Sequence, residues 1–244
     1  MLMGETPRGA AGNGGAVPPL PAVDLIRDRI LDLTLQPGAR IDDKLLMSQF
    51  GLGRTPTREA FNRLAAEGLI VIQRNKGATV RPLDIAHVGQ FFDAYGASER
   101  LVGYFCRTRE PALAAELRAI EAQYERADAG GRYLEVTRLN AEFHGRLARA
   151  SGNEYLCDFA GRLYNHARRL SYFIHLIPGE ANRDLGAMQE AITGHHQEII
   201  AAVEAHDNDA LVRVLTLHAG FFHHWVMEAI SVNRGLSAPL PARL

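Results

Sequence analysis

Four residues in the C-terminal half of the chain have the types and spacing of a metal-binding site: Asn140, His144, His196 and His218. Asn140 and His144 are four positions apart, so on a helix both side chains would project from one face. His196 and His218 lie in two later segments with helical apolar patterns. Three neutral imidazoles and one oxygen can hold a divalent ion such as Zn²⁺ or Ni²⁺ inside a helical bundle.

The same spacing also fits a metal-free interpretation. The chain has ten histidines, so an Asn-x3-His pattern arises easily by chance, and on spacing alone packing histidines are the better interpretation. We interpret His195, His223 and His224 as surface or packing residues for the same reason. Spacing therefore leaves the metal site open.

A second chemical signal lies in residues 51–70, where a tight turn precedes an amphipathic helix. The first turn of this helix carries two guanidinium and two hydroxyl groups, on Arg54, Thr55, Thr57 and Arg58. The N-terminal end of a helix is also the positive end of its dipole, so this end suits phosphates and base edges. The pattern predicts a recognition helix for the DNA major groove. A capped helix with solvated arginines is the alternative.

The flanking segments predict the rest of a winged helix-turn-helix domain over residues 22–83. Upstream, an apolar stripe indicates a first helix, and a second short helix spans residues 43–50. Downstream, β-rich runs at 69–72 and 78–80 are joined by a hairpin whose basic tip contains Lys76. Three helices followed by a basic two-stranded wing are typical of a DNA-binding domain.

Helical periodicity continues through the remainder of the chain. Six helices with short connections are expected near residues 84–108, 112–128, 132–150, 154–176, 183–206 and 207–232. They predict a mostly α protein, with an all-α antiparallel bundle over residues 84–234. Residues 1–21, rich in Gly, Ala and Pro, are expected to form a disordered tail, and residues 235–244 a frayed one.

Composition and charge agree with this division. Hydrophobic residues make up 47% of the chain and charged residues 23%, which suits a sizeable core. Residues 22–83 hold ten Lys/Arg and seven Asp/Glu, a net charge of +3, whereas residues 84–244 hold sixteen and twenty, a net charge of −4. The positive charge thus lies where DNA binding is expected.

The cysteines and apolar runs bear on the cellular compartment. Cys106 and Cys157 lie in apolar helical patterns and are interpreted as small buried side chains in a reducing compartment. No apolar run reaches the roughly 18 residues that a membrane span needs. We therefore expect a cytoplasmic protein with no membrane partner.

Residues 22–83 resemble the DNA-binding domain of the GntR family of bacterial transcription regulators. The matching segments are Leu35-Gln-Pro-Gly38, Arg54-Thr-Pro-Thr-Arg-Glu-Ala60, Leu64-Ala-Ala-Glu-Gly-Leu69 and Lys76-Gly-Ala78. The resemblance implies contacts with operator DNA from Lys44, Arg54, Thr55, Arg58 and Gly77. The chain departs from the family at Gly53, where Ser or Thr is usual, and at Lys44, where Arg is common in the fatty-acid-responsive member.

Residues 85–232 resemble the FCD ligand-binding domain of the FadR-like GntR subfamily. The match rests on Phe143-His144, Ser151-Gly-Asn153, His196 and His218. Many FCD domains bind a metal through Asp-x3-His and two later histidines, which implies the ligands Asn140, His144, His196 and His218. Asn140 stands where Asp is usual, and its neutral oxygen predicts weaker metal binding but stronger attraction of an anionic effector. A metal-free pocket, as in the acyl-CoA-responsive member, is the alternative.

A second departure concerns the effector. Tyr95 stands where the family commonly has an Arg that helps hold a carboxylate. A tyrosine can donate one hydrogen bond but supplies no charge. Arg168 and Arg169, on the fourth helix of the bundle, are candidates to compensate as effector-binding residues. A solvated helix face is the other interpretation of these two arginines.

Together these observations predict a metabolite-responsive transcription regulator, most often a repressor in this family, and not an enzyme. A homodimer would place two recognition helices on a palindromic operator, and a small organic acid would bias the pose of the two heads. The alternatives are a metal-sensing regulator and a metalloenzyme with an appended DNA-binding domain. Against the enzyme, the only general base in the matched motif is Glu142, which faces a different side of its helix from Asn140 and His144.

Overall fold

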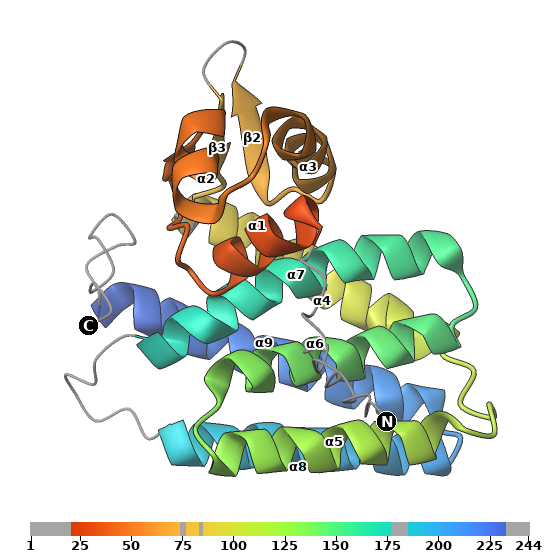
Figure 1. The fold of residues 1–244 in the computed structure, drawn as a ribbon. Coiled ribbons are helices and arrows are strands. Elements are labelled where there is room, and N and C mark those ends of the chain that lie inside the picture. Colours follow the sequence, from red (N-terminus) through yellow and green to blue (C-terminus); the bar gives the residue numbers. More distant parts are fainter. Residues whose placement is uncertain (1–20, 74–76, 83–84, 177–184, 233–244) are drawn as a thin grey trace, which may run out of the picture.

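A computed structural model describes residues 21–73, 77–82, 85–176 and 185–232. In this part of the chain a small N-terminal head packs on a larger, all-helical body (Figure 1). The tails expected at the two ends of the sequence lie outside these residues, except for Pro21.

The described part of the head combines three helices with a three-stranded sheet. Its elements are α1 (Ala22–Leu31), β1 (Arg40–Ile41), α2 (Asp43–Phe50), α3 (Arg54–Ala66), β2 (Ile70–Gln73) and β3 (Gly77–Val80). β3 lies between β1 and β2 and is antiparallel to both, with Ala78 opposite Ile41 on one side and Ile72 on the other. The winged helix-turn-helix prediction is confirmed, and β1 is the one addition to it.

Local signals in the sequence set the bounds of the helix-turn-helix. The carboxylate of Asp42 accepts a hydrogen bond from the backbone N–H of Leu45 at 2.9 Å and so caps the start of α2. Gly51 ends α2 in the left-handed conformation, with a φ of 65°, where a side chain would be strained. Phe61 and Leu64 then bury one face of α3 in the head core, which leaves its N-terminal turn at the surface.

The body consists of six helices over the described residues. They are α4 (Ile85–Phe105), α5 (Leu113–Ala129), α6 (Tyr133–Ala150), α7 (Glu154–Leu176), α8 (Leu185–Glu204) and α9 (Asn208–Val232). The predicted all-α bundle is confirmed. Among the described residues, no helix combines the length and the apolar character of a membrane span.

The body helices are arranged in layers below the head. In Figure 1, α7 and α4 lie nearest the head, α5 and α8 lie on the far side, and α6 and α9 lie between them. The contacts agree: α1 packs on α7, α6 packs on α5 and α7, and α9 packs on α4 and α8. α4 and α9 approach so closely that a Cβ atom at Gly103 would lie 3.0 Å from the Cα of Val212. Residues on α6, α8 and α9 can therefore meet inside the body.

Candidate functional site

Three body helices bring the predicted histidines together. His144 on α6, His196 on α8 and His218 on α9 each offer one ring nitrogen, and these nitrogens lie within 4.8 Å of one another. All three side chains are buried. The ring of Phe143 stacks on His196 with centroids 4.4 Å apart, which holds that imidazole in one orientation.

The pocket contains polar atoms that no described residue satisfies. Asn140 Oδ1, His144 Nε2, His196 Nε2 and His218 Nδ1 are buried and have no hydrogen-bond partner among the described residues. Asn140 precedes His144 by one turn of α6, so both project from one face. Each unpaired buried atom costs about 1–3 kcal/mol, and a divalent cation would satisfy such a set of nitrogen and oxygen donors. We call these four residues the His pocket.

Two buried carboxylates stand behind the histidines. His144 Nδ1 lies 2.9 Å from Oε2 of Glu99, and His196 Nδ1 lies 2.6 Å from Oε2 of Glu121. The hydroxyl of Tyr164 donates to the other oxygen of Glu99 at 2.8 Å. Such contacts place the proton on Nδ1 and leave Nε2 free to bind a metal.

The sequence did not reveal these carboxylates. Glu99 precedes His144 by 45 positions, and Glu121 precedes His196 by 75. No local spacing joins either pair, because α4 and α5 deliver the carboxylates from outside the matched motif. The sequence offered only a weaker signal for them, namely that each glutamate lies on an otherwise apolar helix face.

Burial also controls the charge of two pocket histidines. Desolvation lowers the pKa of His196, while the hydrogen bond with Glu121 opposes the shift. Desolvation lowers the pKa of His218 well below its usual value, and the neighbouring histidines add to this effect. Both rings are therefore neutral at pH 7, which is the form that binds a metal.

Tyr95 adjoins the His pocket through another tyrosine. It is buried on α4, and its ring lies 6.2 Å from the ring of Tyr164, which bonds Glu99. Burial raises the pKa of Tyr95 well above its usual value, and the charge of Glu99 adds to the shift. Tyr95 is thus a neutral donor one side chain away from the predicted ligands.

The two arginines predicted to bind effector make contacts at the head. Arg169 is fully buried on α7, and its Nη2 donates to the backbone carbonyl of Arg81 at 2.8 Å. Arg168 interacts electrostatically with Asp28 and Arg27 of α1. The structure therefore does not bring Arg168 and Arg169 together with Tyr95, and their effector role stays a prediction.

Four of the predicted DNA-binding residues, Lys44, Arg54, Arg58 and Gly77, line a groove of the head. α2, α3 and the sheet form this groove, in which four cationic side chains outnumber two carboxylates. Its polar lining consists of Arg40, Asp42, Asp43, Lys44, Arg54, Arg58, Asn62 and Gln73. Arg58 is largely exposed, and its Nε lies 3.7 Å from Oδ2 of Asp43. An exposed pair at this distance is weak, so DNA phosphates can replace the carboxylate. Thr55 is also exposed, on the first turn of α3.

One predicted DNA contact needs correction, and another lies outside the described residues. Thr57 is fully buried, and its hydroxyl donates to the carbonyl of Gly53 at 2.8 Å. This side chain supports the first turn of α3 and has no surface for DNA. Lys76 lies outside the described residues. Gly77 has a φ of +79°, and a Cβ there would lie 2.5 Å from the carbonyl of Ile41, so only glycine fits.

A winged head with an open basic groove defines a DNA-binding regulator. Family models match both parts of the chain: "Bacterial regulatory proteins, gntR family" over residues 21–80, and "FCD domain" over residues 99–221. The chain belongs to the GntR family of transcription regulators, with an FCD domain as its body. Its family and relatives are regulators and not enzymes, which removes the metalloenzyme alternative.

Individual relatives agree with this assignment. The Nta operon transcriptional regulator of Aminobacter aminovorans is 32% identical over 158 residues, which cover 58% of this chain and 72% of the relative. The HTH-type transcriptional repressor RspR of Escherichia coli (strain K12) is 26% identical over 205 residues, which cover 80% and 82%. The structure of E. coli McbR/YncC superposes with a TM-score of 0.70 at 19% identity, covering 87% of this chain and 96% of that one, and supports the fold.

Proposed function

We propose that the protein is a cytoplasmic homodimeric repressor that releases its operator when a small organic acid enters the His pocket. The observation that carries the proposal is the set of four buried, unpartnered polar atoms on Asn140, His144, His196 and His218. A pocket of this kind lowers its free energy by taking a cation, and the cation then attracts an anion.

A divalent ion such as Zn²⁺ or Ni²⁺ would be held by the three imidazoles and the amide oxygen of Asn140. All four ligands are neutral, so none of them cancels the positive charge of the ion. Glu99 and Glu121 contribute negative charge from behind His144 and His196. The bound ion supplies an electrophilic position for a carboxylate oxygen.

The helices around the pocket connect it with the head. Glu99 lies on α4 and Tyr164 on α7, and both helices also lie next to the head (Figure 1). α7 contacts α1, and Arg169 of α7 bonds the carbonyl of Arg81 in the connection that follows β3. An effector that moves Glu99 or Tyr164 would shift the helices that support the head. Differential affinity for two head poses would then control operator binding.

A homodimer is proposed because a palindromic operator needs two recognition helices. Large apolar side chains are exposed near the end of α4, on Leu101, Tyr104 and Phe105. Such a group suits contact with a second copy. Relatives named as repressors, RspR and GlaR of Escherichia coli (strain K12), favour repression as the direction of control.

A metal-sensing regulator is the second candidate, since the pocket has ligands for a metal before any effector is considered. In a sensor, the ion alone would change operator affinity. In the proposed regulator, the ion would bind without that effect, and the acid would be needed.

The test measures operator binding by fluorescence anisotropy, using DNA selected from random sequence by the protein itself. A panel of mono-, di- and tricarboxylic acids is added to metal-loaded protein. We expect at least one acid to weaken DNA binding, and His218→Ala to abolish this effect. His224→Ala, an exposed histidine on the same helix, is the matched control. An acid effect of equal size in His218→Ala would contradict the proposal, and release by metal alone would identify a sensor.

A further inference from the structure

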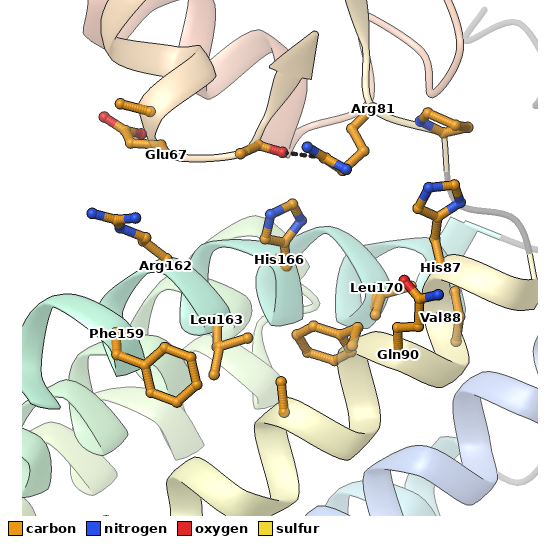
Figure 2. A pocket seen from close by; sticks show the side chains of 15 residues that line it. Glu67, Arg81, His87, Val88, Gln90, Phe159, Arg162, Leu163, His166 and Leu170 are labelled. Carbon is orange, nitrogen blue, oxygen red and sulfur yellow. Dashed lines mark hydrogen bonds between the residues drawn. The ribbon is translucent and has the colours of Figure 1, made fainter.

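A cavity lies at the junction of the head and the body (Figure 2). Its volume is about 390 Å³, which is in the range of small-molecule sites. Its walls come from the C-terminal end of α3, the connection after β3, the start of α4 and the middle of α7. The cavity therefore touches the recognition helix and two body helices at once.

An apolar patch lies on the body side of this junction cavity. α4 contributes Val88, Phe91 and Ala94, and α7 contributes Leu163 and Leu170. Figure 2 shows Leu163, Val88 and Leu170 below the head. This surface fits the carbon skeleton of a ligand, because burying apolar area there stabilises the complex by roughly 25 cal/mol per Å².

Two arginines, one from each side of the junction, add positive charge to the rim of the cavity. Arg81 lines the cavity from the connection after β3, and its Nε donates to the carbonyl of Gly68 at 2.6 Å (Figure 2). Arg162 lines it from α7 and has no hydrogen bond or ion pair with another described residue. Among the cavity's lining side chains, the acidic member is Glu67, whose two oxygens accept hydrogen bonds from Arg27 at 2.8 and 2.6 Å. That carboxylate is already neutralised, so the guanidinium of Arg162 remains available to an anion.

Further polar groups lie in the wall of the cavity and next to it. Burial, together with the charges of Arg169 and Arg81, lowers the pKa of His166 to about 3, so its ring is neutral and can donate a hydrogen bond. Arg169 lies behind the cavity wall, where it interacts electrostatically with His166. It is fully buried, and its Nε and Nη1 have no partner among the described residues. Buried positive charge without a described carboxylate partner makes the site attractive to an anion.

We propose that this junction cavity is a second ligand site, separate from the His pocket, which binds a small carboxylate with a flat or branched apolar body. The carboxylate lies at the Arg81 and Arg162 rim, and the apolar body covers Phe91 and Leu163. Arginine suits this role because its planar fork can hold both carboxylate oxygens. The site needs no effector in the His pocket.

The position of the cavity gives its ligand a regulatory effect. Ala66, Glu67 and Gly68 at the end of the recognition helix form one wall, and α7 forms the facing wall. Head and body already touch here, since a Cβ at Gly68 would lie 3.2 Å from Nε2 of His166. A ligand that fills the remaining space has a higher affinity for the protein when the head is in this position than when the two walls are separated. It therefore holds the head in place and changes operator affinity.

Calorimetry on the full chain tests the site, with 2-naphthoate as the probe and 2-naphthamide as its uncharged analogue. We expect the acid to bind at least about tenfold more tightly than the amide, because a charge-assisted hydrogen bond contributes on that scale. Arg162→Gln should weaken binding of the acid by about tenfold or more and leave binding of the amide unchanged. Arg149→Gln, an exposed arginine of α6, is the matched control.

A filling variant and a pocket variant locate the probe. Ala94→Leu places carbon atoms in the cavity and should abolish binding, with an unchanged melting temperature showing that the fold is intact. His218→Ala should bind 2-naphthoate as the wild type does. Three results would each overturn the proposal: no binding of 2-naphthoate up to about 5 mM, equal affinity in Arg162→Gln, or loss of binding in His218→Ala.

Discussion

The DNA groove of the head and the His pocket of the body use polar groups in opposite ways. In the groove, Arg58 is largely exposed and lies 3.7 Å from its nearest carboxylate, so its guanidinium is free to exchange partners. In the pocket, His144 and His196 are buried, and Glu99 and Glu121 fix their orientation. DNA affinity in the groove depends on the summed charge of exposed side chains, whereas metal affinity in the pocket depends on the position of each ligand atom. A groove substitution should therefore leave the metal affinity of the pocket unchanged when no DNA is bound.

The largest expected effect is on operator binding. Arg54→Ala and Arg58→Ala should each weaken it by about 1–3 kcal/mol, a factor of roughly 5 to 150, because each removes a cation from the first turn of α3. Fluorescence anisotropy at physiological salt measures this, and metal affinity should not change. Arg149→Ala is the control. Wild-type operator affinity in both variants would refute the docking of α3 in the major groove.

The next effect tests the carboxylates behind the pocket. Glu121→Gln keeps the size of the side chain but removes the charge that orients His196, and should weaken metal binding by about 10–100-fold. Calorimetry on chelator-stripped protein measures the affinity. Glu142→Gln, on the exposed face of α6, is the matched control and should leave the affinity unchanged. If both variants bind metal equally well, Glu121 is not part of the site.

A smaller effect of opposite sign is expected at Asn140. Asn140→Asp adds a negative charge beside the proposed ion and should tighten metal binding by about tenfold, after the cost of burying the carboxylate. The same substitution should weaken binding of an anionic effector, since the local positive charge falls by one unit. Parallel titrations with metal and acid measure both changes. Two affinities that move in the same direction would contradict the charge argument.

The smallest effect concerns the stability of the head-to-body contact. The pKa of His166 is lowered from 6.5 to about 3, so the folded protein disfavours the protonated ring. The neutral His166 ring contributes to the free energy of unfolding above pH 6.5, and this contribution is lost as the pH falls toward 3. Between pH 7 and 5.5 the free energy of unfolding should fall by about 1 kcal/mol through this residue.

Urea unfolding of the wild type and of His166→Gln, at each pH, isolates this contribution. The variant should have a flatter dependence on pH over this interval. An identical pH dependence in both proteins would show that His166 is not shielded from protonation in the folded state.

The sequence predicted the elements better than the surroundings of the site. Capping residues such as Asp42 and Gly51, and the period of the apolar residues, determine helices locally, so the helices were found close to their observed bounds. β1 was missed because a two-residue strand has no readable period. Thr57 was misassigned because its position on the first turn does not show which way its hydroxyl points.

The histidines themselves were found because motif and helix spacing are local properties. Their partners were not, since Glu99 and Glu121 meet them only through tertiary packing. The burial of Arg169 was missed for a similar reason, since its partner, the carbonyl of Arg81, lies 88 positions earlier in the chain. The junction cavity likewise exists only between the head and the body, and no single segment of sequence encodes it.

A metal titration of the chelator-stripped chain tests the central claim most directly. The account predicts one Zn²⁺ or Ni²⁺ site per chain, lost in His144→Ala and retained in His224→Ala. Circular dichroism of each variant confirms that the helices are intact. Wild-type protein that binds no ion, or His144→Ala protein that binds one with unchanged affinity, would contradict the account and leave the His pocket metal-free.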